Sequence, residues 1–108
     1  MVVKICLCTV PDAETGRRLA ALWLEKRWAA CVNRVPGIIS HYVWDGEVRE
    51  DAEELLIVKT TEAGAGAIRA ALSDDHPYDC PEWIELSPEG GLDDYLGWIR
   101  DAVSPGSS

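Results

Sequence analysis

The feature that most constrains the fold is a long antiparallel hairpin around Asp45-Gly46. An Asp-Gly pair between two runs rich in β-branched and aromatic residues is a strong signal for a two-residue turn. The two arms, within residues 36–60, are each about ten residues long, whereas strands in globular proteins usually have five or six. We therefore expect the tip of the hairpin to project beyond a domain of this size, and its edges to need a cover.

The segments on either side of the hairpin have the periodicity of strands and helices. The expected elements are a strand over 2–9, a helix over about 13–28, a strand from 31 that bends at Pro36-Gly37 and continues to 44, a return strand over 47–60, a helix over about 61–74, a strand over 82–86 and a third helix within 92–103. This order predicts an α+β fold of the ferredoxin-like type, the split β-α-β-β-α-β arrangement with an added C-terminal helix. Both earlier helices are then expected on one face of an antiparallel sheet.

The second face of this sheet has no cover in the predicted order. We expect it to carry some of Cys6, Cys8 and the alternate residues of the hairpin, which is more apolar surface than a monomer exposes comfortably. The continuous apolar run over 55–58 is expected to be covered on both faces. Tyr42 and Trp44 share one face of the hairpin, and we interpret them as interface residues. The pattern therefore predicts that the chain associates with itself.

Length and charge restrict the class of protein further. The 108 residues predict one domain over 1–103 and a disordered polar tail over 104–108. No apolar run reaches the roughly 18 residues of a membrane span, and the first residues lack the pattern of a signal peptide, so we expect a cytoplasmic protein. A net charge of −9 disfavours nucleic acid and anionic membranes as partners. The four cysteines lack the paired spacing of a zinc site and are expected to be reduced thiols.

Six linked sequence blocks are spread over residues 3 to about 103. The blocks are Cys8-Thr9-Val10-Pro11, Ala29-Ala30-Cys31-Val32-Asn33, Pro36-Gly37, Tyr42-Val43-Trp44-Asp45-Gly46, Lys59-Thr60-Thr61 and His76-Pro77-Tyr78-Asp79-Cys80-Pro81-Glu82, with Tyr95-Leu96-Gly97-Trp98 closing the series. In this order and at these spacings they resemble the CutA divalent-cation tolerance proteins. The resemblance implies a homotrimer of ferredoxin-like subunits, similar to the trimeric nitrogen-regulatory signalling proteins. It also implies a role in tolerance of copper and other divalent cations.

The resemblance further implies a copper site, because ligation in that family is attributed to the cysteine of the first block and to histidine in front of Pro-Tyr. These positions are Cys8 and His76 here, and Asp75 stands where some members have a second histidine. A thiolate near an imidazole suits Cu(I) or Zn(II). Asp75, Asp79 and Glu82 are candidate oxygen ligands for a harder ion such as Mg(II) or Ca(II), with a solvated acidic loop as the alternative. The alternatives are a small buried Cys8 in the core and a local hydrogen bond or cap at His76. The position of His76 beyond a helix end and after two acids favours a cationic imidazole.

Three functions compete at this stage. The first is a homotrimeric divalent-cation tolerance protein that binds copper or another divalent ion. The alternative is a trimeric signalling module that binds a small ligand at subunit interfaces, with Glu53, Lys59 and Tyr78 as a candidate pocket. An enzyme is not expected, because the turn over 9–13 has Pro and Asp where an acylphosphatase needs backbone amides, and no nucleophile signature is present.

Overall fold

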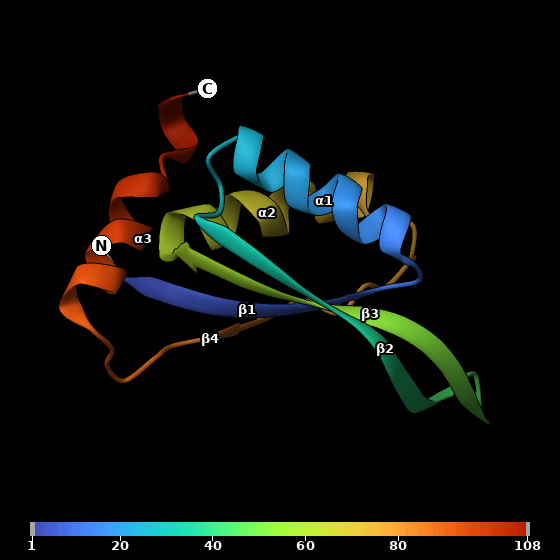
Figure 1. Ribbon diagram of the computed structural model, residues 1–108. Coiled ribbons are helices and arrows are strands. Elements are labelled where there is room, and N and C mark those ends of the chain that lie inside the picture. The colour runs from blue at the N-terminus through green and yellow to red at the C-terminus, as the bar shows by residue number, and fades with distance from the viewer. Residues whose placement is uncertain (1, 108) are drawn as a thin grey trace.

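The computed structural model describes residues 2–107 and shows a four-stranded antiparallel sheet with helices on one face (Figure 1). The elements are β1 (Val3–Val10), α1 (Ala13–Glu25), β2 (Cys31–Trp44), β3 (Glu47–Thr61), α2 (Glu62–Asp75), β4 (Ile84–Leu86), α3 (Asp93–Ala102) and a 3₁₀ turn, η1 (Pro105–Ser107). The strands lie in the order β2-β3-β1-β4. This arrangement confirms the predicted α+β, ferredoxin-like fold.

The main core lies between the sheet and the two helices α1 and α2. Its buried side chains come from both layers, the sheet and the helices: Cys6, Cys8 and Val10 of β1, Leu56 and Val58 of β3, Leu19 and Trp23 of α1, and Ile68 and Leu72 of α2. The prediction that Cys6 and Cys8 lie on the uncovered face was therefore wrong. Both faces of β1 are apolar, so the alternation did not show which face the helices cover, and the wrong choice moves every side chain to the opposite face.

The uncovered face of the sheet carries the other set of alternating residues. Leu7 of β1 lies opposite Ile57 of β3 on one side and Ile84 of β4 on the other. Leu7 and Ile57 are half-buried, and Ile84 and Leu86 are each 46% exposed. The helices cover only one face of β3, so the predicted cover on the second face of its centre stays a prediction. We refer to this apolar surface as the open face.

The β2–β3 hairpin projects past the helices, as predicted (Figure 1). Asp45 and Gly46 at its tip have φ values of 54° and 79°, and positive φ at both central residues is the geometry that tight hairpin turns require. The bend predicted at Pro36-Gly37 is a register shift between Val35 and Ile38, where Gly37 has a φ of 77°. Where the two arms project past the helices, most of their side chains are exposed. The projecting part is therefore stabilised mainly by the hydrogen bonds between its own two strands.

The first helix ends earlier than predicted. α1 stops at Glu25, not near Trp28, because Arg27 has a φ of 59° and turns the chain toward β2. The Arg27 guanidinium then donates hydrogen bonds to the carbonyls of Asp101 and Ala102 at 3.1 and 3.2 Å. The end of α1 is therefore tied to the end of α3, which the helix periodicity alone did not indicate.

The C-terminal part also differs from the prediction. The strand expected over 82–86 is limited to Ile84–Leu86. The tail expected to be disordered from residue 104 is held at its start, because the Ser104 N–H donates to the Arg27 carbonyl at 2.8 Å and η1 follows. Ser108 lies outside the described residues. Within residues 2–107, no helix has the length and apolarity needed to cross a membrane.

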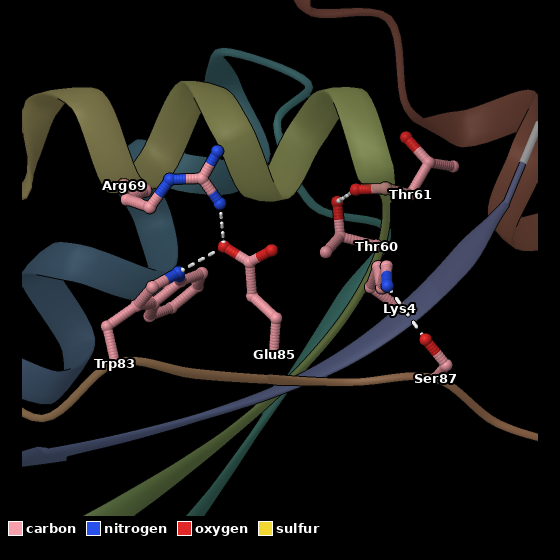
Figure 2. A network of polar contacts seen from close by, with 7 residues as sticks. All are labelled: Lys4, Thr60, Thr61, Arg69, Trp83, Glu85 and Ser87. Atoms are coloured by element: carbon pink, nitrogen blue, oxygen red, sulfur yellow. Dashed lines mark hydrogen bonds and ion pairs between the residues drawn. The ribbon is translucent and has the colours of Figure 1, made fainter.

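A polar network fastens the short edge strand β4 to helix α2 (Figure 2). Glu85 of β4 accepts hydrogen bonds from the Arg69 guanidinium of α2 and, at 2.9 Å, from the Trp83 indole N–H. Nearby, Lys4 of β1 donates to Ser87 at 2.7 Å on the exposed side of the strand. A three-residue strand has few ladder bonds of its own, so these side chains add to its attachment.

Candidate functional site

His76 is buried directly after α2 and uses both of its ring nitrogens within the chain. The residue is only 5% exposed. The Tyr78 backbone N–H donates to Nδ1 at 3.1 Å, so the ring proton is on Nε2, which donates to the Thr9 carbonyl at 2.8 Å. Burial lowers the pKa of His76 below its usual value. The expectation of a cationic imidazole was therefore wrong, and the alternative of a local hydrogen bond is confirmed.

Cys8 lies beside the same carbonyl but inside the core. Its side chain is fully buried, and its Sγ is 3.8 Å from the Thr9 oxygen. Burial, with smaller contributions from Glu82 and Glu53, raises the pKa of the Cys8 thiol to about 12. The structure thus brings Cys8 and His76 to one backbone oxygen, with the thiol protonated and the imidazole neutral.

The third predicted ligand is Asp75, and its backbone carbonyl, not its carboxylate, forms the contact that the structure shows. The Asp75 carbonyl accepts a hydrogen bond from the Arg18 guanidinium at 2.9 Å, which ties the end of α2 to α1. Across residues 2–107, no three His, Cys, Asp or Glu side chains are arranged to hold a metal ion. A metal at Cys8 and His76 would have to displace a proton from a buried thiol and break a hydrogen bond of the imidazole. As arranged in the chain, these residues do not fit a bound ion, and their role as ligands stays a prediction.

A cleft of about 690 Å³ opens beside this cluster, between the base of the hairpin and the loop after α2. It is lined by Thr9, Ser40, His41, Tyr42, Trp44, Arg49, Glu53, Pro77, Tyr78, Asp79, Cys80 and Glu82. The Tyr78 hydroxyl donates to Glu53 Oε2 at 2.7 Å. Burial and Glu53 together raise the pKa of Tyr78 above its usual value. The predicted meeting of Glu53 and Tyr78 is therefore present, whereas Lys59 lies elsewhere and donates to Asn33.

The two hairpin aromatics form one wall of this cleft. Tyr42 and Trp44 are 38% and 50% exposed, and the Tyr42 hydroxyl donates to Asp51 on the facing strand. Sequence reasoning had assigned these rings to an interface, and had weighed Glu82 as an oxygen ligand against the alternative of a solvated acidic loop. Burial and the nearby Glu53 raise the pKa of Glu82, so the two carboxylates share one environment. Glu53 and Glu82 are far apart in the sequence, and only the fold places both in the lining of one cleft.

These features define the class of protein: a ferredoxin-like α+β chain with an extended hairpin, an open apolar sheet face and an acidic, aromatic cleft. The model of the CutA1 divalent ion tolerance protein family matches residues 4–102. The chain therefore belongs to the CutA1 divalent ion tolerance protein family, as its sequence blocks suggested. This is a family of tolerance proteins, not of enzymes.

Individual relatives agree with this assignment. The chain is 44% identical over 98 residues to the divalent-cation tolerance protein CutA of Thermus thermophilus, covering 91% of this chain and 95% of that protein. It is 48% identical over 95 residues, 88% of this chain, to chloroplastic Protein CutA 1 of Oryza sativa, and spans 54% of that relative's length. The solved structure of the divalent cation tolerance protein from Thermus thermophilus aligns with a TM-score of 0.91 at 42% identity, covering 94% of this chain and 99% of that chain.

Proposed function

We propose that this chain forms a homotrimer that acts in tolerance of divalent cations. The observation that carries the proposal is the open face, where Leu7, Ile57, Ile84 and Leu86 make a continuous apolar surface that the chain's own helices leave uncovered. A soluble monomer rarely exposes such a surface, and association of copies removes it from water. The exposed aromatic face of the hairpin extends the same surface, which supports Tyr42 and Trp44 as interface residues.

Copper or another divalent ion is the proposed cargo of this function, since family membership makes a divalent ion relevant. Binding at Cys8, His76 and Asp75 requires the rearrangement described above, so ligands from neighbouring copies belong to this proposal as well. We also propose a cytoplasmic protein without nucleic-acid or membrane partners, on the grounds of its charge and composition.

Light scattering during size-exclusion chromatography tests the trimer. The expected result is one species with three times the mass of a single chain at micromolar concentration. A folded species with the mass of one chain contradicts the proposal.

Titration calorimetry with Cu(II), Zn(II) and, under reducing conditions, Cu(I) tests whether the chain binds an ion. Cys8→Ala is the variant and Cys80→Ala is its control. Heats that are identical for both variants contradict Cys8 as a ligand.

The second candidate is a trimeric signalling module that binds a small ligand at subunit interfaces. The observation in its favour is the cleft, which lies at the base of the hairpin and continues the side of β3 that carries Leu55 and Ile57. A copy that covers the open face would therefore come close to the cleft. The carboxylates of Glu53, Asp79 and Glu82 in its lining disfavour an anionic ligand such as a nucleotide.

A further inference from the structure

The cleft at the base of the hairpin combines negative charge with aromatic rings. Its lining includes the carboxylates of Glu53, Asp79 and Glu82 and a single guanidinium, that of Arg49. Arg49 already lies 4.0 Å from Glu47, an exposed acid on its own strand. The cleft therefore presents an excess of acid to any molecule that enters it.

Two of these carboxylates lack a cationic partner. In the part of the chain that the structure describes, neither Glu53 nor Glu82 forms an ion pair with a lysine or arginine. Glu53 accepts a hydrogen bond from the Tyr78 hydroxyl, a neutral donor. Glu82 is half-buried and lines the same cleft as Glu53, and burial together with the charge of Glu53 raises the pKa of Glu82. Like charges that share a partly dry cleft are relieved by a cation between them.

The side chains that line the cleft determine which class of cation it can bind. Ca(II) takes six to eight oxygen donors, and within residues 2–107 no three His, Cys, Asp or Glu side chains are arranged to hold an ion. The rings of Tyr42, Trp44 and Tyr78 also line the cleft, and aromatic rings attract organic ammonium groups while contacting their carbon chains. Carboxylates accept short, charge-assisted hydrogen bonds from N–H groups. Aromatic walls with unpaired carboxylates thus favour an alkylammonium ion over a bare metal.

We propose that this cleft binds a small organic cation of the alkylammonium class, held between Glu53 and Glu82 and flanked by the rings of Tyr42 and Tyr78. The inference deepens the ligand-binding alternative given above and names the class of ligand. It does not depend on the metal-binding part of the proposed function. The volume of about 690 Å³ accommodates a ligand of several carbon and nitrogen atoms, such as a diamine or a short polyamine.

Titration calorimetry of the full-length protein in its native oligomeric state tests the inference, with spermidine and putrescine as probes. About 0.15 M salt is required, because it screens the attraction of any cation to a chain of net charge −9. We expect one site per chain, with affinity at least tenfold weaker in Glu82→Gln. The matched control is Glu89→Gln, which removes one charge at an exposed position outside the cleft. This control is expected to bind like the unmodified protein.

Each other outcome has a definite meaning. No heat with either amine overturns the inference, and so does an equal loss in Glu82→Gln and Glu89→Gln, which indicates general attraction to an acidic surface. Binding of Mg(II) or Zn(II) that abolishes spermidine binding and is lost in Glu82→Gln also overturns it, in favour of a metal site. If Glu82→Gln does not fold, Asp79→Asn at the exposed rim gives the same test with a smaller expected loss. Mass measurements on the same samples show separately whether the proposed trimer stands.

Discussion

At the scale of single residues, two glycines of α2 differ in what they allow. A Cβ at Gly64 would overlap the Thr60 hydroxyl and the Trp28 carbonyl, whereas at Gly66 the nearest atom is 3.6 Å away in the Arg69 side chain. We expect Gly64→Ala to lower the free energy of unfolding by about 2 to 3 kcal/mol through overpacking. Gly66→Ala should leave it unchanged or raise it by up to about 1 kcal/mol, since alanine is the better helix former. Urea denaturation measures both, and equal effects would contradict the close approach at Gly64.

His76 should make stability depend on pH. Its pKa is lowered in the folded protein, while the imidazole of the unfolded chain titrates near the ordinary value of about 6.5. The unfolded state therefore binds more protons as the pH falls. The stabilisation from neutral His76 is complete above about pH 6.5 and is lost as the pH falls through the folded-state pKa.

We accordingly expect the stability of the unmodified protein to fall between pH 7.5 and pH 5 by more than that of His76→Gln. The difference is measured by thermal or urea unfolding at a series of pH values. His41→Gln is the control, because His41 is exposed on the hairpin and its contact with Glu50 is 3.8 Å long. Parallel pH curves for the unmodified protein and His76→Gln would contradict the buried, neutral imidazole.

At the scale of the elements, Glu85 is the residue that fastens the shortest strand. It accepts from Arg69 and Trp83, and both donors lose their partner in Glu85→Ala. We expect this variant to lose about 1 to 3 kcal/mol of stability and to exchange the β4 amides faster in hydrogen–deuterium exchange. Ser87→Ala, which removes only the exposed bond to Lys4, should change stability by less than about 0.5 kcal/mol. Unchanged exchange at Ile84–Leu86 in Glu85→Ala would show that the ladder alone holds β4.

At the scale of the whole molecule, the open face can be tested at its centre. Ile57 is half-buried on the central strand β3, so a lysine there has access to water in a single chain but not beneath a covering copy. We expect Ile57→Lys to raise the concentration needed for association at least a hundredfold, giving a folded single chain by light scattering. Ala21→Lys, on the exposed face of α1, should associate like the unmodified protein. Intact trimers of Ile57→Lys would show that association uses another surface.

Local signals in the sequence were enough to predict the helices and strands and their order along the chain. The Asp45-Gly46 turn and the bend at Pro36-Gly37 depend on conformations of a few neighbouring residues, and both are present. The sequence placed the C-terminal end of α1 too late, because that end depends on Arg27, a residue type with no special propensity for a left-handed backbone conformation. Its hydrogen bonds to the end of α3 join positions more than seventy residues apart in the chain.

The sequence by itself determined the fold class, the projecting hairpin and the resemblance to the family, because periodicity, turn residues and linked blocks are local or ordered along the chain. Only the tertiary structure decided which face of β1 is buried, that His76 is neutral with both nitrogens engaged, and that Glu53 and Glu82 share one cleft. The physical reason is that burial and charge proximity depend on which surfaces meet in space. The local sequence of a strand with two apolar faces, or of an acidic residue in a loop, does not indicate which distant residues will lie beside it in the fold.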